Sequence, residues 1–187
     1  MNSETVLQAI EAKFLGVVLN ASEPYSLLTL EIGVESIKPL IQWLKDDEFT
    51  NFVFMTDLCG VHYPNQGDKE FAVVYHLHNL ETNFRLRLKT FVGRENINVP
   101  TMSDIYSAAN WMERETFDFY GIIFEGHPNL KRILNMDEMD YFPMRKEYPL
   151  EDGTRTDKDD RYFGRDGNEE LKFDNKKELA RENSNDK

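Results

Sequence analysis

The spacing of apolar residues changes along the chain from helical to strand-like and back. Over residues 6–14 apolar side chains recur at helical intervals, which predicts a helix with Ser3 as its N-cap. A run of β-forming residues predicts a strand over 25–32. The helical period then returns over 34–44 and predicts a second helix, whose start Pro39 should delay or whose axis it should bend.

Three further strands are predicted over residues 51–58, 70–78 and 84–89, and residues 79–83 form the hairpin between the last two. In the last strand apolar and basic residues alternate strictly, so that one face is apolar and the other carries the cations Arg85, Arg87 and Lys89. A strand with one polar face is typical of an antiparallel sheet that is covered on one side. The pattern therefore predicts an α+β fold, with a mixed, largely antiparallel sheet and helices on one face.

The apolar pattern after Pro100 predicts a third helix that continues to Tyr120. Thr101 or Ser103 is expected to cap its start, and Gly121 stands where a left-handed C-terminal cap belongs. The triplet Gly-His-Pro that begins at residue 126 cannot continue a helix and indicates a loop.

The composition changes after Pro149. In residues 151–187, 21 of 37 side chains are charged and few are apolar, so this segment cannot bury a core of its own. We therefore expect a domain at 1–150 and an extended tail at 151–187 that packs on partner subunits.

The charge and composition exclude several classes of function. The net charge of −12 disfavours nucleic-acid binding and attachment to anionic lipid, since the non-specific part of both is Coulombic. No apolar run approaches the roughly 20 residues of a membrane span. With a single cysteine, Cys59, the chain cannot build a disulfide framework or an iron–sulfur site alone. It also lacks the glycine-rich loops that bind nucleotide phosphates.

A carboxylate cluster lies near the end of the third predicted helix, at Glu113, Glu115 and Asp118. Acid–base catalysis needs carboxyl groups that face one site, whereas Glu113 and Glu115 point to opposite sides of a helix. Arg114 and Asp118 have the spacing of a helical i,i+4 ion pair. The cluster is therefore interpreted as an ion-pair network, with catalysis as the minor alternative.

Other reactive side chains have equally ordinary interpretations. His76 and His78 share a strand face with a spacing that zinc can use, but no third ligand is evident. His127 lies in a rigid loop, which suits a structural or partner contact better than proton transfer. Apolar neighbours flank Cys59 and supply no cation to lower its pKa, so a buried, unreactive thiol is expected.

Two segments, Glu113–Leu134 and Phe142–Leu150, together resemble the signature of the 30 kDa subunit family of respiratory complex I. The first contains Glu-Arg-Glu, an acid three residues later, a histidine and then a basic pair; the second departs mildly at Met144, Glu147 and Tyr148. The positions that carry the resemblance, and that are expected to form an interface, are Glu113, Arg114, Glu115, Asp118, Tyr120, Gly121, Gly126, His127, Pro128, Lys131, Arg132, Pro143, Arg145, Lys146 and Pro149.

The resemblance implies a hydrophilic, peripheral-arm subunit of a proton-translocating NADH:quinone oxidoreductase. Such a subunit has no catalytic, cofactor-binding or metal-binding residues of its own, while FMN, iron–sulfur clusters and quinone belong to partner subunits. The expected partners are chiefly the 49 kDa-type quinone-site subunit and neighbouring iron–sulfur subunits. The implied location is the cytoplasmic side of the bacterial inner membrane, without insertion into the bilayer.

Two alternatives stay open from the sequence. The same scaffold could belong to a membrane-bound hydrogenase-type complex, because related subunits occur there. The contrary interpretation is a free-standing acid–base enzyme that uses Glu113, Glu115 or His127.

Overall fold

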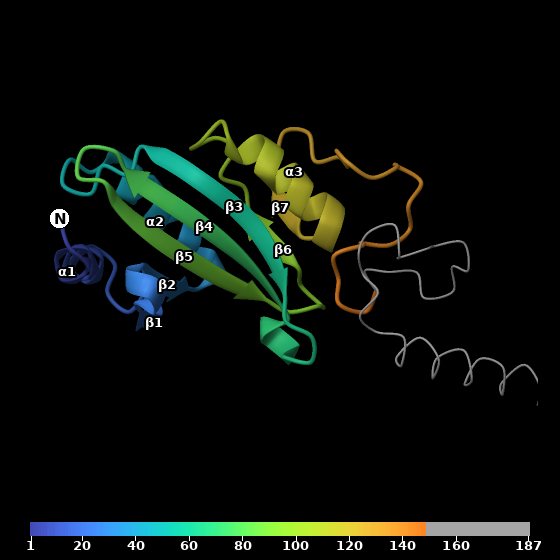
Figure 1. Ribbon diagram of the computed structural model, residues 1–187, viewed down its shortest axis with the longest axis horizontal. Coiled ribbons are helices and arrows are strands. Elements are labelled where there is room, and N and C mark those ends of the chain that lie inside the picture. The colour runs from blue at the N-terminus through green and yellow to red at the C-terminus, as the bar shows by residue number, and fades with distance from the viewer. Residues whose placement is uncertain (149–187) are drawn as a thin grey trace, which may run out of the picture. The chain divides into compact units, whose positions relative to one another are not determined.

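The computed structural model describes residues 1–148, which fold into three α-helices, two single-turn 3-10 helices and two β-sheets (Figure 1). The predicted tail at 151–187 and the signature residue Pro149 lie outside the described residues. In chain order, the elements are α1 Ser3–Lys13, β1 Val18–Ser22, η1 Pro24–Ser26, β2 Leu28–Ile32, α2 Val34–Asp46, β3 Phe54–His62, η2 Gly67–Lys69, β4 Phe71–Asn79, β5 Phe84–Val92, β6 Asn98–Pro100, α3 Ala109–Tyr120 and β7 Ile123–Glu125.

The main sheet has the strand order β1-β2-β5-β4-β3. All neighbouring strands are antiparallel except β2 and β5, which pair in parallel and are separated in the chain by α2, β3 and β4. The hairpin between β4 and β5 is the predicted one. A second, small sheet pairs β6 with β7 in parallel. The predicted α+β class, with a mixed and largely antiparallel sheet, is therefore confirmed.

The alternation in β5 has the predicted register. Leu86 and Leu88 are fully buried, whereas Arg85 is exposed and Arg87 and Lys89 are partly exposed on the opposite face. The apolar face and the polar face both extend onto β4, since Leu86 lies opposite Leu77 while Arg87 lies opposite His76. Because side chains alternate strictly along a strand, burial of the leucines fixes the positions of the cations.

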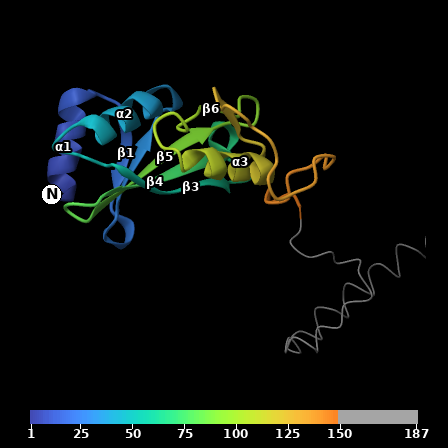
Figure 2. The same ribbon diagram turned by 90° about the horizontal axis from the view of Figure 1, so that it is seen from above.

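Helices α1 and α2 lie behind the main sheet in Figure 1 and on one side of it in Figure 2, and α3 lies along β3. The core lies between these helices and the apolar sheet face, and its fully buried members include Ile10, Leu30, Ile37, Leu40, Ile41, Leu44, Val73, Tyr75, Leu77, Leu86 and Leu88. Within residues 1–148 no helix covers the opposite sheet face. Among the same residues, none of the helices is long and apolar enough to cross a membrane.

Both N-terminal helices differ from the prediction at their starts. Asn2, not Ser3, caps α1, and its side chain accepts a hydrogen bond of 2.8 Å from the amide of Thr5 in a capping box. Helix α2 begins directly at Val34, so the expected late start is wrong. Pro39 lies close to the N-terminus of α2, where a missing N–H removes a single intrahelical hydrogen bond.

The strand boundaries also shift. The predicted strand at 25–32 is shorter, since residues 24–26 form a 3-10 turn in which Tyr25 has a φ of 57°. The preceding strand β1 was not predicted, because most of its side chains are exposed and it lacks an apolar face. The strand predicted over 51–58 lies at 54–62, where it pairs with β4 along its whole length.

Helix α3 begins at Ala109, eight residues later than the earliest predicted cap. The hydroxyl of Thr101 accepts a hydrogen bond from the amide of Ser103 at 3.1 Å and donates one to the carboxyl group of Glu113 at 2.5 Å. These local side-chain bonds compete with helical ones, so residues 101–108 form turns instead of a first helical segment.

Candidate functional site

Close backbone packing holds α3 against the edge strand β3. Gly60 lies on β3, and a Cβ atom at this position would be 2.6 Å from the ring of Tyr120 and 2.9 Å from the methyl group of Thr116. Both distances are shorter than a non-bonded carbon contact, so only glycine allows α3 to approach the strand this closely. This contact positions the whole helix that carries the Glu-Arg-Glu motif.

Glu113 is fully buried on the inner side of α3. Its carboxyl group accepts a hydrogen bond of 2.5 Å from the hydroxyl of Thr101 and one of 2.6 Å from the amide of Met102. Burial raises the pKa of Glu113 to about 7, and the two hydrogen bonds offset only part of this effect. Glu113 therefore fastens the turn at 101–102 to the helix, and it forms no ion pair within residues 1–148.

Asp118 is also fully buried, but unlike Glu113 it is surrounded by groups that stabilise its negative charge. Its carboxylate pairs with the guanidinium of Arg132 at 2.8 Å and accepts amide hydrogen bonds from Ile133, Leu134 and Asn135 at 2.7–3.0 Å. Burial alone would raise the pKa of Asp118, but these hydrogen bonds outweigh it and hold the pKa well below its usual range. Asp118 thus fixes residues 132–135 along α3.

Arg114 does not form the predicted ion pair with Asp118. Its guanidinium donates to the carbonyl oxygens of Lys131 at 3.1 Å and Arg132 at 3.0 Å, and it lies 5.3 Å from the ring centre of Trp111. The prediction is wrong because five donors already surround the carboxylate of Asp118. Arg114 instead satisfies carbonyl groups in the segment that Asp118 holds.

The second signature segment packs against the C-terminal end of α3. Gly121 has a φ of 75°, as predicted, and a Cβ atom there would lie 2.6 Å from the ring of Phe142. Arg145 donates a hydrogen bond of 2.8 Å to the carbonyl of Tyr120, and its guanidinium lies 4.6 Å from the ring centre of Phe142. Pro143 is half-buried in the same segment.

The loop after β7 is held by His127. Its Nδ1 accepts a hydrogen bond from the amide of Asn129 at 3.0 Å, so Nε2 carries the proton that is donated to the carbonyl of Asn110 at 3.1 Å. Gly126 has a φ of 83° and, with Pro128, makes the exposed turn. Both imidazole nitrogens are occupied by backbone groups, which agrees with the predicted structural role.

A second cluster of ionisable groups, which the sequence did not reveal, lies at the end of the main sheet. His62, Glu70 and Glu147 bring their ligand-type atoms within 4.8 Å of one another, and the guanidinium of Arg94 bridges the two carboxylates at 2.6 and 2.7 Å. His62 accepts the amide hydrogen of Lys146 at Nδ1 and faces Glu70 with Nε2 at 3.0 Å. Hydrogen bonds from Arg94 and then His62 lower the pKa of Glu70. The cluster joins residues 146–147 to the sheet through groups that stand far apart in the sequence.

The remaining candidates lie on the open sheet face and engage neighbouring side chains. The Nε2 atom of His76 accepts a hydrogen bond from Arg87 at 2.9 Å, and His78 is hydrogen-bonded to Asn83 at 2.9 Å. The thiol of Cys59 is only partly buried, but burial and then Asp57 raise its pKa to about 11. A thiol with so high a pKa is a poor nucleophile at neutral pH, as the sequence predicted.

Among the signature residues within 1–148, five are exposed. They are Glu115, Gly126, Pro128, Lys131 and Lys146. Large apolar side chains are also exposed on α3 and on the segment that Arg114 and Asp118 hold, with exposed fractions of 61% for Trp111, 65% for Leu134 and 68% for Met136. We call these three residues the α3 patch.

Comparison with known proteins gives one consistent result. Residues 30–154 match the family described as "Respiratory-chain NADH dehydrogenase, 30 Kd subunit". The chain is 44% identical over 136 residues to the C subunit of the NADH-quinone oxidoreductase of Sinorhizobium medicae (strain WSM419). The aligned region covers 72% of this chain and 67% of that relative.

Two solved structures share the fold. A trypsin-resistant fragment of Nqo5 matches with a TM-score of 0.58 and 30% identity, over 70% of this chain and 100% of the fragment. A chain of the membrane-bound sulfane sulfur reductase (MBS), an archaeal respiratory membrane complex, matches with a TM-score of 0.67 and 26% identity, over 79% of this chain and 85% of that chain. The fold, the α3 signature and these relatives together show that the chain belongs to the family of the 30 kDa subunit of respiratory-chain NADH dehydrogenase and is the corresponding subunit of NADH-quinone oxidoreductase.

Proposed function

We propose that this chain is a non-catalytic structural subunit that docks through its α3 patch on the 49 kDa-type quinone-site subunit, near the iron–sulfur subunits. In this proposal FMN, the iron–sulfur clusters and quinone are all held by other subunits. The chain then lies on the cytoplasmic side of the bacterial inner membrane as a peripheral member of the complex.

The main support for the proposal is that the charged signature residues bind groups of their own domain. Arg114, Asp118 and Arg132 all form contacts within the domain, and these contacts fix the segment from which Leu134 projects. The result is a rigid apolar surface next to the exposed Trp111. Exposed apolar groups on a fixed backbone are typical of protein–protein interfaces, because little conformational entropy is lost on docking.

The geometry gives little support to the acid–base enzyme. The carboxyl group of Glu113 is fully buried and already bonded, while Glu115 is exposed on another side of the helix. His127 uses both ring nitrogens for backbone hydrogen bonds. A general acid or base must reach the proton it transfers, and these groups do not converge on one position.

A substitution on the α3 patch tests the proposal. Leu134→Ser removes an exposed apolar side chain without touching the domain core, and Leu15→Ser, at a position that is 93% exposed, is the matched control. We expect Leu134→Ser to lower the amount of assembled complex in native gels while NADH:quinone turnover per complex stays near normal. Equal assembly of both variants, or normal assembly with lost turnover, would contradict the proposal.

A further inference from the structure

The open face of the main sheet carries two arginines that have no acidic partner among residues 1–148. The guanidinium of Arg85 forms no hydrogen bond or ion pair with any other residue in 1–148. Arg87 uses only Nε, which donates to His76, so its two terminal amino groups have no partner in the same range. Cations without carboxylate partners are unexpected in a chain whose net charge is −12.

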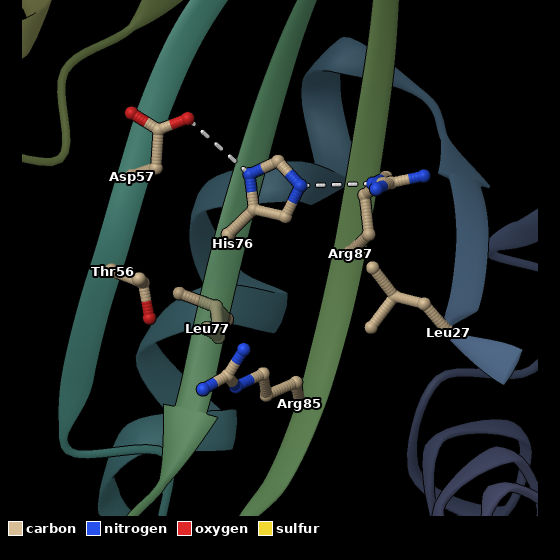
Figure 3. A pocket seen from close by; sticks show the side chains of 7 residues that line it. All are labelled: Leu27, Thr56, Asp57, His76, Leu77, Arg85 and Arg87. Atoms are coloured by element: carbon tan, nitrogen blue, oxygen red, sulfur yellow. Dashed lines mark hydrogen bonds and ion pairs between the residues drawn. The ribbon is translucent and has the colours of Figure 1, made fainter. Parts of the chain in front are cut away.

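These arginines line a shallow hollow of about 270 Å³ that lies over β3, β4 and β5 and is bounded by Leu27. In Figure 3, Arg85 extends across β4 toward Thr56, and Arg87 lies between His76 and Leu27. Thr56 is exposed at a register shift in β3, which places its hydroxyl at the edge of the hollow. The hollow thus combines two guanidinium groups, a hydroxyl and an apolar wall from Leu27.

The orientation of Arg87 is fixed by its neighbours. Because Nε2 of His76 accepts the hydrogen bond from Arg87, its proton lies on Nδ1, which is 3.5 Å from the carboxylate of Asp57. Burial and the nearby guanidinium lower the pKa of His76, which agrees with a neutral ring. The hydrogen bond at Nε thus fixes the guanidinium of Arg87 at the rim of the hollow, and its two terminal amino groups have no partner within residues 1–148, so they can bind a planar, bidentate acceptor.

We propose that this hollow binds an extended acidic segment of a partner subunit, with two carboxylates that stand two residues apart. Arg85 and Arg87 leave the same face of β5 at an interval of about 7 Å, which an extended peptide reproduces between alternate side chains. The carboxylate of Asp57 on the same face makes the hollow unsuitable for a continuous polyanion such as RNA or an anionic membrane surface. The inference rests on the proposed function, since it assumes that the chain lies in an assembled complex.

The test is photo-cross-linking in the assembled complex. The photoreactive residue p-benzoylphenylalanine replaces Thr56 in one strain and Trp111 in a second, so that one probe reports on the hollow and the other on the α3 patch. The Thr56 probe is then combined with Arg85→Gln and, as a control for net charge, with Lys13→Gln in the last turn of α1. Lys13 is exposed and lies outside the hollow.

We expect the Thr56 probe to cross-link a peptide of another subunit that contains two acidic residues separated by one residue. Arg85→Gln should lower that yield about tenfold, while Lys13→Gln should leave it unchanged. A cross-link only from Trp111 would overturn the inference and leave the proposed function intact, whereas no cross-link from either probe would contradict both. A Thr56 cross-link to residues 149–187 of the same chain or to lipid, or a yield that Arg85→Gln does not change, would also overturn the inference.

Discussion

Replacing Glu113 by glutamine should change the way in which stability depends on pH. The protonated carboxyl group can donate a hydrogen bond to the hydroxyl oxygen of Thr101 and accept one from the amide of Met102. Glutamine has the same shape and offers the same donor and acceptor. The variant therefore reproduces the neutral form of Glu113 at every pH and cannot ionise.

The magnitude follows from the pKa. In the folded chain the pKa of Glu113 is raised from 4.5 to about 7, so the unfolded chain ionises first. The stability that the neutral acid contributes is fully present below pH 4.5 and is lost as the pH rises through 7. One pKa unit corresponds to about 1.4 kcal/mol, so the free energy of unfolding should fall by about 3 kcal/mol across this window.

The assay is urea unfolding of the full-length chain and of Glu113→Gln at half-unit steps from pH 5 to pH 8. Glu115→Gln, at an exposed position two residues along the same helix, is the matched control. We expect Glu113→Gln to gain stability relative to the natural chain as the pH rises, whereas the control should differ by no more than about 0.5 kcal/mol throughout. Parallel pH profiles for the natural chain and Glu113→Gln would refute the reasoning.

Three other substitutions test the packing around α3. Asp118→Asn leaves the nearly buried guanidinium of Arg132 unpaired and should cost about 3–5 kcal/mol in urea unfolding, so a loss below 1 kcal/mol would contradict the assigned role. Gly60→Ala should cost about 1–3 kcal/mol by the same measurement, because its Cβ would clash with α3, whereas Gly33→Ala has no atom within 4 Å and should be nearly neutral. Arg114→Ala releases the carbonyls of residues 131 and 132 and should lower complex content in native gels; normal content with turnover lost by orders of magnitude would instead assign Arg114 to the chemistry.

The elements that the sequence predicted well are those whose pattern is local. Strict alternation in β5 fixed which side chains are buried, and the apolar stripe of α2 is its buried face. Strand β1 has no such stripe, since it is an edge strand with mostly exposed side chains, and its place comes from pairing with β2. The start of α3 depends on a side-chain bond between Thr101 and Glu113, which periodicity does not detect.

The candidate site shows the same division. The resemblance located the residues of the signature. The i,i+4 spacing predicted an ion pair between Asp118 and Arg114, whereas the partner of Asp118 in the folded chain is Arg132, fourteen residues away. The second cluster joins residues that stand far apart in the sequence: His62 and Glu147 are separated by 85 positions, with Glu70 and Arg94 between them. Such contacts depend on the tertiary arrangement of β3, β4 and the segment after α3, which no single stretch of sequence encodes.

Because the signature charges form contacts within the domain, a substitution can impair assembly in two ways. It can destabilise the domain, or it can remove a side chain that docks on a partner. Asp118→Asn removes the contacts that hold residues 132–135, so unfolding stability and complex content should fall together. Leu134→Ser removes only an exposed side chain from the same segment, so complex content should fall while unfolding stability stays within about 0.5 kcal/mol. If both variants lost stability equally, Leu134 would belong to the domain's own packing, and the α3 patch could not be the docking surface. If neither variant affected assembly, the charged and apolar groups around α3 would serve the isolated domain alone.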